Sequence, residues 1–279
     1  MILSIITINR NNAAGLEKTM QSVLSQTRTD FEYVVVDGAS TDDSVAVIER
    51  FAPAFGDRMK WISEPDKGIY NAMNKSIGMA TGEYVQFLNS GDLFVSPDVV
   101  DRVYAAVDQA EPPSILYGNR IKVFPDGHTV KDRFVAGKEI TFYHFYRSTL
   151  GHQTAFIRRA LFDRYGLYDE TLRIVSDWKW FIQVIALGGE VTAYADVDIV
   201  YYDMTGISQR ELSLHWQERK QVLSSILPAR ILADYKIWDF DVEQMTRLRR
   251  FPWAYKLVWF LERCLFKWEK WTKPRKKKQ

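Results

Sequence analysis

Short, largely apolar runs alternate with amphipathic segments through the first third of the chain. Ile2–Ile8 and Phe31–Val36 have the length and composition of buried strands. Between them, Ala13–Gln26 carries apolar side chains at helical spacing, namely Leu16, Met20, Val23 and Leu24. This pattern predicts that the chain opens with a strand, a helix and a second strand.

The alternation continues with a predicted strand at Met59–Ile62, a helix at Ile69–Ala80 and a strand at Glu83–Leu88. The segment Asp37–Asp42 breaks the chain after the second strand, and Ser40 within it is predicted to cap the next helix. Strands that alternate with helices form a mostly parallel sheet with right-handed crossovers. We therefore predict an α/β fold with a mostly parallel, Rossmann-like sheet flanked by helices.

The pattern weakens after Leu88. Residues 112–150 mix short β-like pieces with glycines, and order returns with a predicted strand at Gln153–Ile157 and a helix at Asp177–Leu187. A chain of 279 residues that is 47% hydrophobic can build one α/β domain of ~200 residues and a smaller extension. We place the domain at residues 1–208 and a helical extension at 209–279.

Three polar segments follow predicted strands directly: Thr7–Asn11, Asp37–Asp42 and Asn89–Asp92. Ligands of open α/β sheets bind outside the carboxyl ends of the strands, and these segments lie there. Thr7 and Asn9 in the first segment are therefore candidate ligand-binding residues.

Several motifs occur in a fixed order along the chain: Ser4–Thr7, Val36–Asp42, Ser63–Asn74, Phe87–Asp92 and Ser176–Asp177. Together they resemble the family 2 glycosyltransferases of bacterial polysaccharide assembly, in particular transferases of the colanic-acid type. The resemblance covers roughly residues 2–208. It implies the GT-A fold, with a nucleotide-sugar half at about 1–95 and an acceptor half at about 96–208.

The resemblance assigns the donor nucleotide to two of these motifs. In the family, the residue matching Asp37 accepts hydrogen bonds from uracil or ribose, although Asp37 and Gly38 could instead form only a turn. The segment with Asp66, Asn71 and Asn74 closes over the base and phosphates. The spacing of three places the two amides on one helical face, whereas Asp66 could instead cap the helix.

The segment Asn89–Asp92 matches the place where the family has an Asp-x-Asp pattern that binds a divalent cation with the diphosphate. Here Asn89 and Gly91 replace the two acids, which leaves Asp92 as the expected ligand of Mg²⁺ or Mn²⁺. One carboxylate suffices, because such cations keep waters and bind substrate phosphates as well. We count Asn89 among the donor-binding residues, and the alternative for Asp92 is a turn.

Asp177 stands where the family has the general base that takes the proton of the acceptor hydroxyl. An Asp in the first turn of a helix is also favoured by the helix dipole alone. His152 lies between the metal motif and Asp177 in the sequence, and we expect it to be a structural, hydrogen-bonded histidine. The segment 201–208 resembles a flexible segment that folds over the donor, with Gly206 as its hinge.

Charge separates the end of the chain from the rest. From Gln244 onward there are twelve Lys or Arg and two acids, so the remainder carries a net charge of −8 although the whole chain carries +2. An acidic body with a basic, aromatic end indicates binding to an anionic surface rather than to nucleic acid.

Apolar side chains recur at three- and four-residue intervals near this end: Trp253, Leu257, Phe260, Leu261, Leu265 and Trp268. A basic amphipathic helix of this kind lies in the headgroup region of a membrane, and Lys273–Lys278 adds five cations. The alternative is a helix packed on the catalytic domain. With no leader pattern, no uncharged run of membrane-spanning length and Cys264 as its single cysteine, we expect a cytoplasmic protein, peripheral on the inner face of a bacterial plasma membrane.

These observations predict an inverting glycosyltransferase. It moves a sugar from a nucleotide sugar, with UDP favoured, to a hydroxyl of a lipid-linked saccharide. The rival is a non-catalytic nucleotide-sugar-binding or scaffolding protein of a polysaccharide assembly complex. A nucleotidyltransferase is disfavoured because Thr7–Asn11 lacks the expected glycines.

Overall fold

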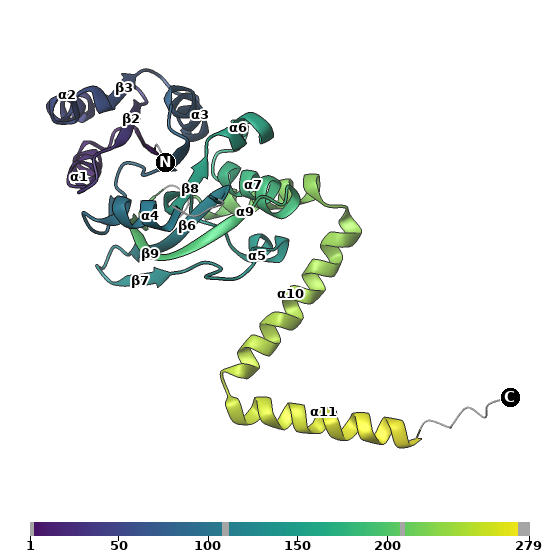
Figure 1. The fold of residues 1–279 in the computed structure, drawn as a ribbon. Helices are drawn as coiled ribbons and strands as arrows, with labels where there is room; N and C mark the ends of the chain where they lie inside the picture. The colour runs from purple at the N-terminus through teal and green to yellow at the C-terminus, as the bar shows by residue number, and fades with distance from the viewer. Residues whose placement is uncertain (1–2, 108–111, 207–209, 273–279) are drawn as a thin grey trace. The chain divides into compact units, whose positions relative to one another are not determined.

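The computed structural model describes residues 3–107, 112–206 and 210–272, which divide into two compact units. The first unit is Met1–Lys220 and the second is Gln221–Gln279. The first unit therefore runs past residue 208, where the sequence suggested that the catalytic domain ends, and includes the first half of helix α9 (Leu212–Ile226). Figure 1 shows its strands surrounded by helices.

The strands of the first unit belong to one sheet, whose order is β3-β2-β1-β4-β8-β6-β9-β5, with β7 paired to β6. They are β1 (Leu3–Asn9), β2 (Phe31–Asp37), β3 (Met59–Ser63), β4 (Tyr84–Phe87), β5 (Leu93–Phe94), β6 (Ile115–Val123), β7 (Thr129–Asp132), β8 (Ala155–Arg158) and β9 (Thr192–Asp203).

The helices before α9 surround this sheet. They are α1 (Ala13–Leu24), α2 (Ser44–Phe55), α3 (Ile69–Met79), α4 (Val99–Val107), α5 (Phe142–Arg147), α6 (Ala160–Tyr165) and α7 (Ser176–Phe181). Short turns of helix lie at η1 (Gly56–Arg58) and η2 (His152–Thr154), and α7 continues as a π-helical stretch, η3 (Ile182–Leu187).

The predicted α/β class is confirmed, but the sheet as a whole is mixed. β1 pairs in parallel with both β2 and β4, and β2 with β3, as the alternation of strands and helices predicts. In the second half, β8 runs antiparallel to β4 and β6, and β5 runs antiparallel to β9. Parallel pairing needs a long crossover, which the first half supplies with α1, α2 and α3, whereas β6 and β7 are joined by a short hairpin.

The burial pattern explains why the strands and helices in the first half of the first unit could be predicted from the sequence. Every residue of β1 is buried, as befits a strand with neighbours on both edges and helices on its faces. The buried positions of α1 are Leu16, Thr19, Met20 and Val23, which repeat at helical spacing. The three apolar ones pack into the core cluster with β1 and β2. The apolar pattern therefore predicted both the element type and the face that packs.

Ser40 does not cap the following helix. α2 begins at Ser44 with Asp43 at its N-cap, and the Ser40 hydroxyl donates a hydrogen bond to Asp37 Oδ1 instead. A hydrogen bond from Ser40 to the charged carboxylate of Asp37 is stronger than a bond with a neutral backbone group at the start of α2, because a charged acceptor strengthens the bond. The loop after β2 thus folds back on the end of its own strand.

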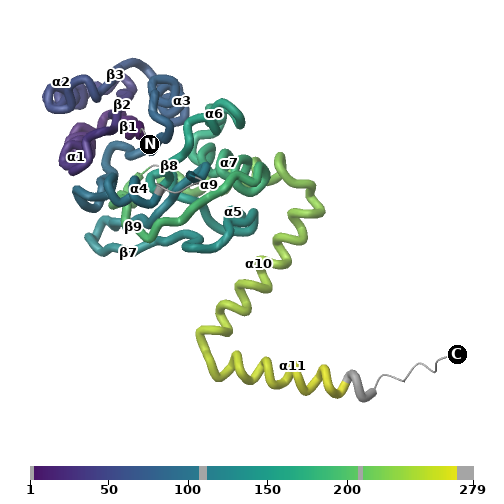
Figure 2. The backbone as a smooth tube through the Cα atoms, viewed as in Figure 1, coloured from purple at the N-terminus to yellow at the C-terminus, as the bar shows by residue number. Residues whose placement is uncertain are grey.

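The second unit contains the end of α9 and two long helices, α10 (Ala229–Arg249) and α11 (Pro252–Thr272), which Figure 2 traces as consecutive segments of the chain. The predicted helical extension therefore has helices, while Lys273–Lys278 lies outside the described residues. Among the helices described, we find none with an apolar stretch of the length that a bilayer crossing requires.

Candidate active site

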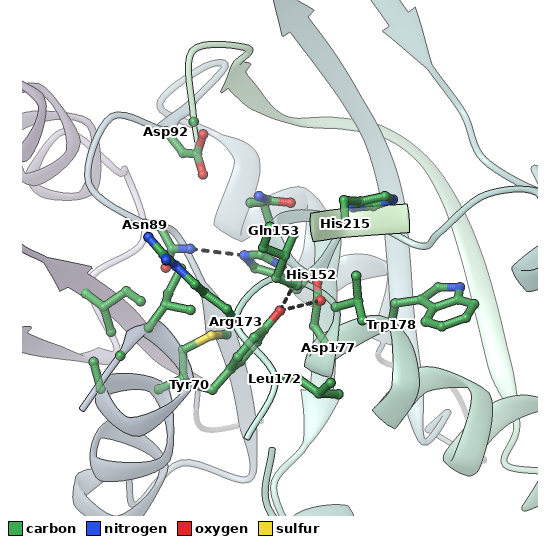
Figure 3. A pocket seen from close by; sticks show the side chains of 18 of the residues that line it. Tyr70, Asn89, Asp92, His152, Gln153, Leu172, Arg173, Asp177, Trp178 and His215 are labelled. Carbon is green, nitrogen blue, oxygen red and sulfur yellow. Dashed lines mark hydrogen bonds and ion pairs between the residues drawn. The ribbon is translucent and has the colours of Figure 1, made fainter. Parts of the chain in front are cut away.

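The carboxyl ends of β1 and β4 open into a cavity of about 1200 Å³ in the first unit. Its walls come from the loops after these strands, the segment 66–73, the segment 170–178, the end of β9 and the start of α9. Typical pockets for small ligands measure about 300–1,000 Å³, so this one has room for a ligand of nucleotide-sugar size. Figure 3 shows the cavity from close by.

The structure brings most of the sequence-predicted site residues to this cavity. The lining includes Asn9, Asp66, Asn71, Asn89, Asp92 and Asp177. Thr7, Asp37 and Asn74 are not part of the lining, and their polar groups bond within the protein. Thr7, for example, is fully buried and donates to the Leu88 carbonyl at 2.7 Å, which ties β1 to the end of β4.

Asp37 is fully buried at the end of β2 and organises the neighbouring loops. Its carboxylate accepts hydrogen bonds from Asn9 Nδ2 at 2.8 Å, from the Ser40 amide and hydroxyl, and from the Ser63 hydroxyl. Burial alone would raise the pKa of Asp37, but these bonds outweigh it and hold the pKa below its ordinary value. Asn9 lines the cavity, and its buried Oδ1 has no partner among the described residues. Asp37 therefore fixes the side chain of Asn9 in the cavity wall.

Gly38 allows the Asp66 side chain to approach this loop. A Cβ at position 38 would lie 2.6 Å from Asp66 Oδ2, closer than non-bonded atoms can sit. Asp66 in turn forms an ion pair with Lys75 at 3.0 Å and lines the cavity. The two motifs that sequence reasoning treated separately therefore meet in one wall.

Asn71 and Asn74 do share one face of α3, as their spacing predicted. Their amide groups donate to the two oxygens of Glu170, each at 2.9 Å. Asn74 also exchanges two hydrogen bonds with the backbone of Tyr168, which satisfies its amide within the protein. The pair therefore joins α3 to the segment that leads to Asp177.

Asp92 lies 5% exposed at the cavity, where the Asp203 amide donates to its Oδ1 at 3.2 Å. Burial raises the pKa of Asp92 to about 7, and the nearby negative charge of Asp203 adds to the rise, while His152 and Arg120 oppose it. A buried carboxylate beside a second carboxylate is a site that a cation would stabilise.

The residues present fit a Mg²⁺ or Mn²⁺ ion, because such cations prefer oxygen ligands. Asp92 and Asp203 would hold it, and both line the cavity. Within the described ranges, no three His, Cys, Asp or Glu side chains converge as a metal cluster. Oxygens from a substrate diphosphate or from water would therefore have to complete the shell.

Asp177 lies on the opposite side of the cavity, held between two donors (Figure 3). Its Oδ2 accepts from His152 Nδ1 at 2.8 Å, and its Oδ1 accepts from the Tyr70 hydroxyl at 2.9 Å. Burial would raise the pKa of Asp177, but the bond and charge of His152 and the bond from Tyr70 lower it below its ordinary value. Asp177 is therefore a carboxylate at neutral pH and can accept a proton.

Aromatic anchors place Asp177 at the start of α7. Trp178 and Trp180 are buried, and their indole N–H groups donate to the carbonyls of Phe145 and Gly166 at 2.9 and 2.8 Å. Each such indole contributes on the order of 4–6 kcal/mol of apolar burial before entropic costs. The predicted amphipathic helix therefore has its polar start toward the cavity, as expected.

Two buried charges from α9 fix the surroundings of Asp177. Glu218 accepts hydrogen bonds from the amides of residues 173, 174 and 175, which form the segment directly before α7. Arg219 stacks on Trp178 at 4.1 Å and donates to the Phe145 carbonyl, and burial lowers the pKa of Arg219 to about 10. Sequence analysis found neither residue, because nothing local marks two charges on a mostly exposed helix as buried.

His152 lies in the site rather than apart from it. The sequence favoured a structural, hydrogen-bonded histidine, and the ring is hydrogen-bonded: it contacts Asp177 through Nδ1 and Asn89 through Nε2, the latter at 3.0 Å. Its position between the two motifs in the sequence was a signal for this placement.

Further cationic side chains line the cavity and were missed, among them Arg10, Lys67, Arg120, Lys122 and Arg173. Arg10 and Lys67 form no ion pair with any residue that the structure describes, so their charge is available to an anionic ligand. Arg10 belongs to the polar segment after β1 and could have been selected on that ground.

Comparison with known proteins places the chain in a family context. The family model described as glycosyl transferase family 2 matches residues 4–166. A protein of Mycobacterium bovis named PGL/p-HBAD biosynthesis glycosyltransferase is 33% identical over 205 residues, which cover 74% of this chain and 78% of the relative. An uncharacterized glycosyltransferase of Mycobacterium tuberculosis is 33% identical over 220 residues, which cover 76% and 79%.

Solved structures share the fold at lower identity. Residues 1–349 of S. aureus TarS, crystallised with UDP-GlcNAc, match with a TM-score of 0.61 and 22% identity over 73% of this chain and 58% of that one. The mannosyltransferase PcManGT of Pyrobaculum calidifontis, in complex with GDP-Man and Mn²⁺, matches with a TM-score of 0.57 and 18% identity over 72% and 56%. At these identities the likeness concerns the fold.

Proposed function

The chain belongs to glycosyl transferase family 2 and is a glycosyltransferase, and from this premise we propose that it transfers a sugar from a nucleotide sugar to an acceptor hydroxyl with inversion. One observation carries the proposal: Asp92, in the loop after β4, and Asp177, at the start of α7, line the same cavity. The proposed proton acceptor, Asp177, and the proposed binding site for the diphosphate and its cation, at Asp92, therefore face the same cavity.

In the proposed reaction, Asp177 takes the proton of the acceptor hydroxyl as its oxygen bonds to the anomeric carbon of the donor. The bond between that carbon and the diphosphate oxygen breaks, and the nucleoside diphosphate leaves with the electron pair. Arg10 and Lys67 are positioned to offset its charge. A Mg²⁺ or Mn²⁺ ion held by Asp92 and Asp203 would neutralise charge on the leaving diphosphate when bound.

We propose a UDP-sugar as donor, which agrees with the UDP-GlcNAc in the TarS structure, while the GDP-Man of PcManGT keeps GDP-sugars as the alternative. Asn9, whose Oδ1 has no partner among the described residues, and Asp66 and Asn71 in the cavity wall are the proposed contacts of the nucleotide. Asp37, Thr7 and Asn74 then act by holding these residues in place. The colanic-acid type remains our interpretation of the motifs, since the named relatives come from mycobacteria.

A panel of UDP- and GDP-sugars tests this function with the full-length protein. With Mn²⁺ present and the donor at about 100 times its dissociation constant, binding should add about 2.7 kcal/mol, which raises Tm by roughly 5–10 °C. Release of nucleoside diphosphate from the same donor should follow. ADP-sugars serve as the control. Binding without any release would favour the non-catalytic rival, and the absence of any shift would contradict both proposals.

We further propose a lipid-linked saccharide as acceptor, with the protein held at the cytoplasmic face of a bacterial membrane by α11. Apolar side chains of this helix are exposed in the second unit, among them Trp253, Leu257, Phe260, Leu261 and Leu265. At 100° per residue these five fall within about 140°, and Lys256, Arg263 and Lys267 fall within about 40° of each other at the border of this face. The exposed Trp259 and Phe266 lie outside it. A helix with these two faces suits an anionic lipid surface.

Substituting Leu257 and Leu261 together by Glu should weaken binding of the full chain to anionic vesicles at least about tenfold. The reason is that two apolar side chains that would be buried in the lipid surface are replaced by charged ones. Sedimentation with phosphatidylcholine vesicles, with and without phosphatidylglycerol, measures this at low and high salt. Ile237→Glu, an exposed apolar position of α10, is the matched control. Equal binding to both vesicle types would remove the electrostatic role, and a large loss of thermal stability would instead indicate that α11 packs on the protein.

A further inference from the structure

Three polar side chains from distant parts of the chain form a continuous hydrogen-bonded row across the cavity. Asn89 follows β4, His152 lies in η2 and Asp177 lies in α7. Asn89 Nδ2 is 3.0 Å from His152 Nε2, and His152 Nδ1 is 2.8 Å from Asp177 Oδ2. The dashed line between Asn89 and His152 in Figure 3 marks the first of these contacts.

The direction of these bonds follows from what each atom can do. The carboxylate of Asp177 only accepts, so His152 carries its proton on Nδ1 and donates it. In the neutral form of the ring, Nε2 is then an acceptor, to which the amide of Asn89, 3.0 Å away, can donate. An aspartate at position 89 could not do this, because a carboxylate has no proton to donate. Asn89 therefore selects the ring tautomer that faces Asp177.

The second donor to Asp177 is weaker. The Tyr70 hydroxyl has a single proton and two acceptors, the Ile174 carbonyl at 2.6 Å and Asp177 Oδ1 at 2.9 Å. His152 gives its Nδ1 proton to Asp177 alone. The imidazole is therefore the main group that fixes the carboxylate, and its side chain is only 12% exposed.

The side-chain amide of Asn89 also has an oxygen, Oδ1. Since Nδ2 is committed to His152, Oδ1 is left buried with no partner among the described residues. Asn89 lines the cavity in the same loop as Asp92, on the side where we propose that the donor diphosphate binds. The row thus links the donor side of the cavity to the carboxylate on the acceptor side.

We propose that His152 is a positioning residue for Asp177, and that Asn89 stands where the family pattern has an acid because only an amide can hold His152 in the required tautomer. The proposal rests on the proposed role of Asp177 as proton acceptor. It gives the departure from the acidic pattern a chemical reason, and it predicts that restoring the acid is harmful.

The Asn89→Asp variant tests this, since it restores the acid of the family pattern with little change in shape. We expect kcat for donor turnover to fall about 10- to 100-fold, as small misplacements of reacting groups do. The dissociation constant for UDP with Mn²⁺ should stay equal or become smaller, because the added carboxylate favours cations. Turnover at the wild-type kcat would overturn the proposal.

A spectroscopic measurement separates this proposal from the proposed function. Two-bond ¹H–¹⁵N spectra of ¹⁵N-histidine-labelled protein report which ring nitrogen carries the proton, with no substrate present. We expect the Nδ1–H tautomer for His152 in the wild type and its loss in Asn89→Asp, whatever reaction the protein catalyses. An Nε2–H ring in the wild type, or an unchanged signal in the variant, would refute the tautomer argument.

Conservative replacement of His152 gives an independent test of the proposal. An asparagine at position 152 can place its amide N–H where Nδ1 lies, so His152→Asn should recover part of the kcat that His152→Ala loses, with similar KM for the donor in both. His128→Ala, in the exposed turn between β6 and β7, is the control. Equal kcat for the Asn and Ala variants would show that the donated hydrogen bond has no role.

Discussion

Replacing Asp177 by Asn is expected to lower sugar transfer by about 10²-fold or more, which is within the usual range for loss of a general base. The amide has the shape of the carboxylate and its oxygen can still accept a hydrogen bond from His152. It cannot take the proton of the acceptor hydroxyl, because a neutral amide is a very weak base. Nucleoside diphosphate release in the presence and absence of acceptor measures the loss.

Binding and stability should separate from rate in this variant. Asp177 lies across the cavity from Asp92, so titration of UDP with Mn²⁺ should give a dissociation constant near that of the wild type. The anchors of α7, Trp178 and Trp180, are unchanged, so Tm should stay within a few degrees of the wild type. Transfer by Asp177→Asn at close to the wild-type rate would remove Asp177 from the mechanism.

Replacing Asp92 by Ala should abolish the dependence of nucleoside diphosphate binding on Mn²⁺. It should also lower the rate of sugar transfer relative to the wild type, on the order of 10²-fold. The physical reason is that Asp92 is the buried carboxylate of the proposed cation site, and loss of charge stabilisation on a leaving diphosphate is worth several kcal/mol. Calorimetric titration of UDP with Mn²⁺, with Mg²⁺ and with chelator measures the effect directly.

Two further variants sharpen this test. Asp203→Asn should weaken Mn²⁺-dependent binding less than Asp92→Ala, since it removes the charge of a neighbour that is more exposed. Asp198→Asn, on the same strand β9 and bonded to Asn119 and Lys131, should leave binding unchanged. If chelators leave transfer by the wild type unchanged, the cation has no part in the reaction.

The first half of the fold could be read from the sequence because its signals are local. The buried runs around Ile5 and Val34 and the helical spacing of Leu16, Met20 and Val23 each specify an element within a dozen residues. Parallel pairing then follows from the alternation of strands and helices. In the second half the sequence predicted the strand that is β8 but not its antiparallel pairing, because the pairing of short strands such as β8 and β5 depends on partners far along the chain.

The same division applies to the site. The motifs brought Asp92 and Asp177 forward because strand ends and helix starts are local features, and the structure places both in one cavity. Asp37 lies in an equally clear motif, yet its carboxylate accepts hydrogen bonds from Asn9, Ser40 and Ser63, because the loop after β2 folds back over it. A motif therefore marks the place of a residue but not which atoms it contacts.

By itself, the sequence determined the α/β class, the order of elements in the first half, the strand ends that carry chemistry and the basic, aromatic end of the chain. Only the tertiary structure decided that His152 joins Asn89 to Asp177, that Tyr70 and Glu218 hold Asp177 and the segment before it, and that Asp203 lies beside Asp92. Periodicity and capping act over a few residues, so they can be read along the chain. Contacts between side chains far apart in sequence depend on strand order, on helix placement and on which donor each acceptor meets, and these follow only when the whole core has packed.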